Sequence, residues 1–175
     1  MEQTDTYEII HKILTAKEAS KEKVKEALQS VLIESVEAFK AIDVYQRQFV
    51  DKNEVRAPQF YYEAQDALSG YYMYLSPIVM VLTALKEVRS NSYFHSVRVS
   101  FEKNPPLKKN DKGFEVHEKF VSAPVEKESQ EHVSEETYIA AVFIGYLDAC
   151  RTAIQTCRNR TKSYEEETRT SRTQT

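Results

Sequence analysis

Glycine, proline, cysteine and tryptophan are scarce in this chain of 175 residues, which contains 3 Gly, 5 Pro, 2 Cys and no Trp. So few glycines argue against a glycine-rich nucleotide-binding loop and against an all-β fold with many tight turns. The chain also lacks a CxxC pair or a Cys/His cluster, so the sequence predicts no zinc site. Apolar residues make up 41% of it, which excludes a wholly disordered chain. The composition therefore predicts a soluble and largely helical protein.

The sequence carries no readable targeting or membrane signal. Met1–Ala19 lacks the basic start and the apolar run of a signal peptide. The longest apolar stretch, Ile78–Leu85, is too short to span a bilayer. Cys150 and Cys157 would lie about 10 Å apart on a helix, too far for a disulfide, and are expected to be reduced core residues. We therefore expect a cytoplasmic protein without membrane contacts (in the host cytoplasm, if the chain is viral).

Residues 1–57 are expected to form an N-terminal helical segment. Asp5 precedes a glutamate by three positions and can cap a short helix over Tyr7–Leu14. Thr15 starts a second capping pattern of the same kind. Apolar residues then recur at helical spacing as far as Phe49, and the opposite face carries ordinary solvated charges.

Residues 58–164 are expected to form the helical core. Pro58 suits the first turn of a long helix, Pro77 should kink it, and Ser90–Ser92 is a plausible end. Its apolar stripe comprises Phe60, Ala64, Ala67, Tyr71, Tyr74, Ile78, Val81, Leu85 and Val88. The sequence therefore predicts a long amphipathic helix with one face in the core.

A hairpin or loop insertion is expected at about residues 96–133. Val97, Val99 and Phe101 alternate with polar residues, and Asn110–Gly113 resembles a turn. These features predict a small β-hairpin over residues 97–121. The competing interpretation continues the helix to Lys103 and leaves a loop. Residues 123–133 are polar and acidic and are expected to form a linker.

Ser134 is expected to start the last helix, with Val133 packing on Tyr138 as a hydrophobic staple. Its predicted buried stripe comprises Tyr138, Val142, Tyr146, Ala149, Ala153 and Cys157. Residues 165–175 contain no apolar side chain and are expected to be a disordered tail. The predicted fold class is mainly α, with long amphipathic helices in an extended helical hairpin or bundle. Such long stripes also predict a homo-oligomer.

Positive charge is concentrated in two windows although the whole chain has a formal charge of −3. The first window, residues 86–109, holds six cations and only two acids, Glu87 and Glu102, for a net charge of +4. Its cations are Lys86, Arg89, Arg98, Lys103, Lys108 and Lys109. The second window, residues 151–162, holds four cations and no acid. Cations beside Tyr93, Phe94 and Phe101 are typical of a single-stranded nucleic-acid site, where charges follow phosphates and rings stack on bases.

Two segments, covering about two fifths of the chain, resemble the UvsY-like recombination mediators of bacteriophages. The first reads Phe60-Tyr-Tyr-Glu-Ala-Gln, followed by Tyr71-Tyr72, Tyr74-Leu75 and Leu85-Lys86. It is similar to that family's helix with an aromatic start and a basic end. The second reads Tyr138-Ile-Ala-Ala-Val, followed by Leu147-Asp-Ala-Cys, Ala153-Ile and Arg158-Asn-Arg160. It is similar to the family's C-terminal helix.

The resemblance implies a non-enzymatic assembly; from the residues themselves we expect no cofactor and no metal site. Members of that family form rings, bind single-stranded DNA, and help load a RecA-like recombinase onto strands covered by a single-strand-binding protein. Their basic DNA-binding positions match Lys86 and Arg89 here, with Arg98 a plausible third. This chain departs from the family in its N-terminal helical stretch, its probable hairpin and its acidic overall charge.

Two alternatives remain open at the level of sequence. Arg89 and His95 form an Arg-x5-His arrangement that resembles the Arg-x4–6-His motif of the helical, dimeric HEPN ribonucleases, in which Arg and His from both subunits converge on an RNA 2′-hydroxyl. Alternatively, the chain is a non-catalytic scaffold or assembly protein that uses only its helical stripes.

Overall fold

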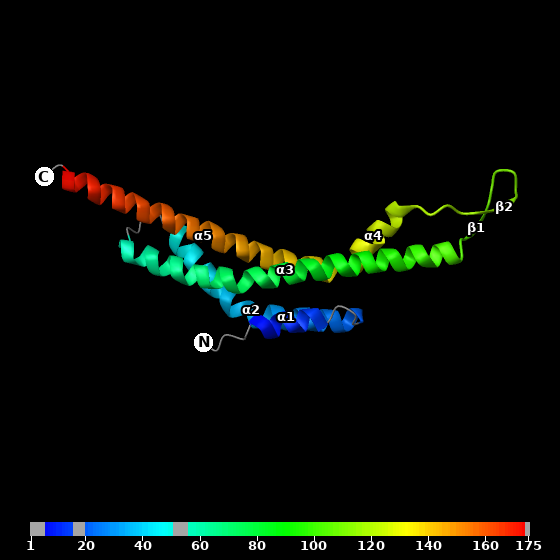
Figure 1. Ribbon diagram of the computed structural model, residues 1–175, viewed down its shortest axis with the longest axis horizontal. Helices are drawn as coiled ribbons and strands as arrows, with labels where there is room; N and C mark the ends of the chain where they lie inside the picture. The colour runs from blue at the N-terminus through cyan, green and yellow to red at the C-terminus, as the bar shows by residue number, and fades with distance from the viewer. Residues whose placement is uncertain (1–5, 16–19, 51–55, 174–175) are drawn as a thin grey trace.

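The protein is described here from a computed structural model that places residues 6–15, 20–50 and 56–173. Within these ranges the chain forms five helices and one small two-stranded sheet (Figure 1). The helices are α1 (Thr6–Thr15), α2 (Lys21–Val50), α3 (Pro58–Lys103), α4 (Ser122–His132) and α5 (Ser134–Thr173), and the strands are β1 (Leu107–Lys109) and β2 (Glu115–His117). The predicted mainly α fold with long helices is confirmed. The second capping pattern, after Thr15, falls mostly outside the described residues.

Helix α3 is longer than the sequence predicted. It begins at Pro58, as expected, and continues for 46 residues, or about 69 Å, through Pro77 and past Ser90–Ser92. The predicted end at Ser90–Ser92 is therefore wrong; the competing interpretation is correct in extending the helix to Lys103 but wrong in leaving only a loop after it, because a short hairpin follows. The helix ends immediately before Pro105 and Pro106, where proline removes the donors that the next turn would need.

The β-hairpin is shorter than predicted and starts later. Three residues pair on each side, with Lys108 opposite Val116 and Lys109 opposite Glu115. The Asn110 side chain accepts hydrogen bonds from the backbone N–H groups of Lys112 and Phe114, at 3.0 and 2.9 Å. Gly113 has a φ of +80°, which a residue with a side chain rarely adopts. The turn predicted at Asn110–Gly113 is thus present, and every residue of both strands is exposed.

Two segments predicted to be irregular are helical. Residues 123–132 of the expected linker lie within α4, whose Ser129 accepts a hydrogen bond from the Ser90 hydroxyl of α3. The expected tail at 165–175 continues α5 as far as Thr173. Near the start of that stretch, Tyr164 donates a hydrogen bond to the backbone oxygen of Arg56, and Tyr62 bonds Glu165. Both segments are thus helical although their composition predicted irregular structure, and in each case side chains contact residues that are distant in the sequence.

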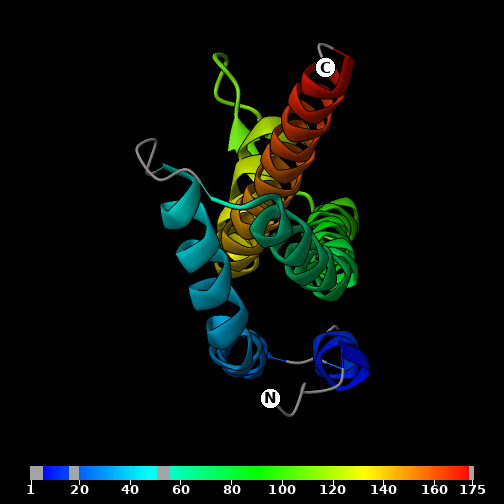
Figure 2. The same cartoon turned by 90° about the vertical axis from the view of Figure 1, so that its left-hand side faces the viewer.

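The core lies where α3 and α5 pack side by side, with α1 and α2 packed against this pair (Figures 1 and 2). Phe39 of α2 stacks on Tyr146 of α5 at 4.0 Å between ring centroids and meets Phe143 edge-on at 5.1 Å. The buried face of α3 comprises Tyr61, Ala64, Leu68, Leu75, Ile78, Leu82, Leu85 and Arg89. The N-terminal helices therefore share one apolar core with α3 and α5.

Some residues that the apolar stripes assigned to the core are exposed in the structure. Val88 is 37% exposed and Tyr138 is 64% exposed, although Val133 beside Ser134 is buried. The staple prediction is therefore wrong in its second residue. Cys150 and Cys157 are both buried and free, as predicted.

Helix α3 and the Ser134–Ser171 part of α5 are each long and apolar enough to cross a membrane, by length and composition alone. Core helices of soluble proteins pass the same test, so the expected absence of membrane contacts stays a prediction. Only 28% of the most apolar 18-residue window of α3 is buried, and 33% of that of α5. Most residues of these two windows are therefore half-buried or exposed within one chain.

Candidate nucleic-acid interface

The six predicted binding residues fall into three different environments. Arg89 is buried between helices, Lys86 lines a groove, and Arg98, Lys103, Lys108 and Lys109 are exposed beyond the start of α5. The structure therefore does not assemble the first window into one surface. The window is divided at the point along α3 where α5 begins: Lys86 and Arg89 lie on the covered side, and the other four cations lie beyond it.

Arg89 forms a buried ion pair with Glu136 of α5. Its Nε lies 2.8 Å from Glu136 Oε1, and the two side chains are only 9% and 2% exposed. Arg89 continues the buried stripe of Leu82 and Leu85 at helical spacing, so its side chain points into the core. A charge removed from water in this way must be paired. Arg89 is therefore not exposed to a ligand in this arrangement, and its predicted contact with nucleic acid stays a prediction without support from this geometry.

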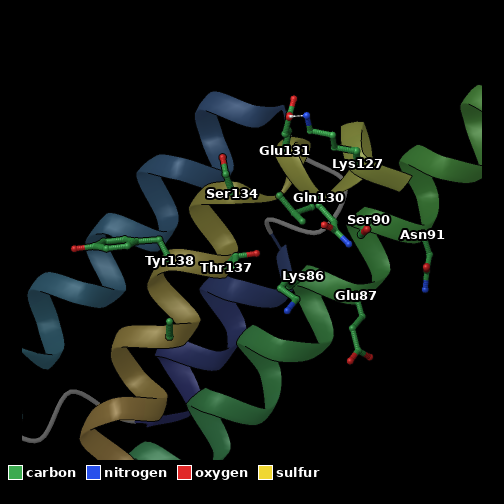
Figure 3. A pocket seen from close by; sticks show the side chains of 12 residues that line it. Lys86, Glu87, Ser90, Asn91, Lys127, Gln130, Glu131, Ser134, Thr137 and Tyr138 are labelled. Carbon is green, nitrogen blue, oxygen red and sulfur yellow. Dashed lines mark ion pairs between the residues drawn. The ribbon is translucent and has the colours of Figure 1, made fainter. Parts of the chain in front are cut away.

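Lys86 lies beside a groove of about 810 Å³ formed by α3, α4 and α5 (Figure 3). The groove also holds Glu87, Lys127 and Glu131, and Lys127 Nζ lies 4.0 Å from Glu131 Oε1. Two cations and two acids balance, so this groove offers no net attraction to a polyanion. Lys86 therefore lies in an electrically balanced groove and does not belong to the group of exposed cations.

The remaining cations gather at the far end of the molecule. We define the basic tip as Arg98, Lys103, Lys108, Lys109, Lys112 and Lys119, all of which are exposed. Residues 98–119 also contain four acids, Glu102, Asp111, Glu115 and Glu118, so six cations against four acids leave +2. Arg98 Nε lies 2.9 Å from Glu102 Oε1, with both side chains more than half exposed. Such an exposed pair is weak and leaves the guanidinium accessible to a phosphate.

The aromatic residues near the tip differ in their availability for stacking. Tyr93 stacks on His132 of α4, with ring centroids 4.6 Å apart and an interplanar angle of 21°. Phe94 and Phe101 both meet Phe120 edge-on, at 6.0 and 5.4 Å. These three rings, which the sequence proposed as stacking groups, already pack within the chain.

Phe114, which the sequence analysis missed, is 68% exposed beside the hairpin turn. Lys112 and Lys119 were also missed, because the first window was ended at Lys109. The turn signal at Asn110–Gly113 could have identified this cluster, since it places the intervening and following residues at a projecting end.

The second basic window lies at the opposite end of the α3–α5 pair. Arg158, Arg160 and Lys162 are exposed on the C-terminal half of α5. That half runs beside the beginning of α3, as the Tyr62–Glu165 hydrogen bond of 2.9 Å indicates (Figure 1). The two windows therefore do not combine within one chain.

Arg89 and His95, the pair behind the ribonuclease alternative, are not brought together. Arg89 is buried against α5, whereas His95 is exposed on another face of α3. Within the described parts of the chain, no group of three or more His, Cys, Asp or Glu side chains could hold a metal ion. Within one copy, Arg89 and His95 therefore do not form a single centre.

Comparisons with protein-family models, curated proteins and solved structures found no match to this chain.

Proposed function

We propose that the protein is a non-catalytic single-stranded DNA-binding protein that holds the strand at its basic tip. The observation that carries the proposal is the set of six exposed cations at one projecting end, beside an exposed aromatic ring. Cations supply sequence-independent attraction to phosphates, and a free ring supplies a stacking surface for an unpaired base. The proposed site thus keeps Arg98, Lys103, Lys108 and Lys109 and omits Arg89 and Lys86.

The hairpin supports this proposal because its strands are exposed and thus accessible to a ligand. Both strands are exposed, and a two-stranded hairpin on its own is at best marginally stable in water. Its stability therefore gains from a ligand that contacts it. The local net charge of +2 matters more for that ligand than the −3 of the whole chain, because the potential of exposed charges decays within about 8–10 Å in physiological salt.

Under this proposal, the partners are those that the family resemblance implies. The protein would assemble as a homo-oligomer on single-stranded DNA covered by a single-strand-binding protein and would promote loading of a RecA-like recombinase. A recombinase whose DNA-dependent ATP hydrolysis is inhibited by the covering protein provides the assay. Restored hydrolysis on addition of this protein supports a mediator; unchanged hydrolysis leaves a DNA-binding protein without that role.

DNA binding itself is tested by fluorescence anisotropy with a labelled oligo-dT and the full chain. Affinity should fall as salt increases, with a slope of about −0.7 per phosphate contact in a plot of log affinity against log salt. In Lys103→Ala/Lys108→Ala/Lys109→Ala, the slope should be smaller by about 2 and the affinity at low salt should drop at least about 10-fold. Phe114→Leu should lose about 1–3 kcal/mol of binding free energy if that ring stacks on a base.

A matched control variant distinguishes the loss of cations at the basic tip from the loss of three positive charges anywhere on the protein. Arg158→Ala/Arg160→Ala/Lys162→Ala removes three exposed cations from the opposite end and should leave affinity and slope nearly unchanged. Absence of binding by the natural chain at about 50 mM salt would reject the proposal. A loss in the control variant equal to that in the tip variant would reject the site.

A further inference from the structure

Helix α3 carries a mostly exposed stripe, largely apolar, on the face turned away from its buried residues in the part of the chain that the structure describes. Met73 and Met80 are 75% and 70% exposed, two of the most exposed large apolar residues in the described parts of the chain. With Gly70, Pro77, Ala84 and Glu87 they define the outer stripe, on the face opposite Leu75 and Leu82. The spacing alternates between three and four residues, which is the pattern of a helix seam that meets another helix.

The sizes of the residues along this stripe alternate in a way that complements a reversed copy. Large Met73 and Met80 are interleaved with the smaller Pro77 and Ala84. If a second α3 runs antiparallel with its midpoint between Ile78 and Val79, Met73 faces Ala84 of the second copy and Met80 faces Pro77. A parallel pair would instead place methionine on methionine and Glu87 on Glu87.

Gly70 fits the same arrangement. A Cβ atom added there would have no atom of the chain within 4 Å, so nothing inside one copy requires a glycine. Glycine weakens a helix relative to alanine, and it is useful where another group must approach closely. In the antiparallel register Gly70 lies opposite Glu87 of the second copy, whose long side chain gains that space.

The charges of α3 are also complementary to a reversed copy. From Pro58 to Leu85 the helix carries two acids, Glu63 and Asp66, and no Lys or Arg. From Lys86 to Lys103, apart from the buried and paired Arg89, it carries three cations against two acids. Antiparallel pairing sets the negative half of each helix against the positive half of the other, which favours this orientation over the parallel one.

We propose that a second copy of this chain docks on the outer stripe, with the two α3 helices antiparallel about a two-fold axis between Ile78 and Val79. In this register Glu63 lies opposite Phe94 of the second copy; the span between these positions is about 48 Å, and a contact strip about 10 Å wide would bury about 1,000 Å² over both copies. That area is at the lower limit for a specific interface, so the dimer is weak and depends on concentration. The inference is independent of DNA binding.

Sedimentation of the full chain over a concentration range from about 1 to 100 µM tests it. The natural chain should convert from monomer to dimer, and Met73→Glu/Met80→Glu should weaken association at least about 100-fold by placing charges in the interface. Ile33→Glu/Val44→Glu on α2 is the matched control, because those residues are 71% and 52% exposed and lie outside the stripe. It should dimerise normally, and helical circular dichroism should be unchanged in both variants.

Cross-linking tests the register. A short bismaleimide should join Met73→Cys protein to Ala84→Cys protein when the two are mixed, and should join neither to itself. A chain that stays monomeric throughout the range, or a dimer broken by the α2 variant and not by the α3 variant, would overturn the proposal. Self-joining of Met73→Cys would also overturn it, because that result requires either a parallel pair or an antiparallel pair with its axis near residue 73. So would binding of anionic phospholipid vesicles by a monomer through the same two methionines.

Discussion

Arg89 and Arg98 belong to the same helix and make ion pairs of nearly equal length, yet they have different roles. The Arg89–Glu136 pair measures 2.8 Å and is buried, whereas the Arg98–Glu102 pair measures 2.9 Å and is mostly exposed. Helix α5 begins at Ser134, so it covers α3 at the level of Arg89, whereas Arg98 stays exposed. Coverage by another helix, and not the pair distance, separates a structural cation from one available to a ligand.

The buried pair gives the largest expected effect. Arg89→Ala leaves Glu136 charged and unpaired in the core, so the free energy of unfolding should fall by about 3–5 kcal/mol. Arg98→Ala, the matched change on the exposed part of the same helix, should alter it by less than about 0.5 kcal/mol. Urea unfolding followed by circular dichroism measures both.

Replacing both partners sharpens this contrast. In Arg89→Met/Glu136→Leu no charge stays buried, and much of the loss should be recovered. A double variant as unstable as Arg89→Ala would indicate that the cavity, and not the unpaired charge, causes the loss.

Two neighbouring positions of α3 provide the next largest contrast. Leu82 is fully buried and Met80 is 70% exposed. Leu82→Ala should therefore lower the free energy of unfolding by about 2–5 kcal/mol. Met80→Ala should change it by no more than about 0.5 kcal/mol in dilute, monomeric protein. Similar losses at both positions would contradict the orientation of the helix.

The two cysteines predict a smaller effect that depends on pH. Burial raises the pKa of both Cys150 and Cys157 to about 11, above the value of about 8.5 expected in the unfolded chain. The unfolded chain therefore loses protons between these values that the folded chain retains. The thiol contribution to stability is complete below about pH 8.5 and declines as pH rises toward 11.

The difference between the natural chain and Cys150→Ala/Cys157→Ala isolates this contribution. The natural chain should lose more free energy of unfolding between pH 8 and 10 than the variant. Parallel curves would show that the thiols are not protected by the fold.

The smallest expected effect lies in the hairpin. Gly113→Ala strains a residue at positive φ and should cost about 1 kcal/mol locally. Because the strands are exposed, global unfolding should be almost unchanged while the affinity for oligo-dT falls. A clear drop in global stability would show that the hairpin supports the core.

Sequence reasoning located the features that depend on local chemistry. The start of α3 at Pro58, the turn at Asn110–Gly113 and the helical character of the chain all follow from residues within a few positions. The buried, free cysteines were also predicted, because their helical spacing excluded a disulfide.

Features that depend on distant residues were missed. The alternation of Val97, Val99 and Phe101 fits a strand. In the structure all three belong to helix α3, and Phe101 packs on Phe120, a residue 19 positions later. The role of Arg89 depends on Glu136, although a signal was present: each is a charged residue at the end of the buried face of its own helix, in line with the apolar residues of that face. Pairing such charged residues between two predicted helices would have identified the ion pair.

Hydrogen exchange of the full chain with and without oligo-dT tests most directly whether exposed cations at the tip, and not the Arg89 region, hold the strand. The account predicts slower exchange in residues 104–119, where the hairpin lacks cover, and unchanged exchange around Arg89 and Glu136. Protection confined to the second basic window of α5, or no protection anywhere under conditions where the oligonucleotide binds, would contradict it.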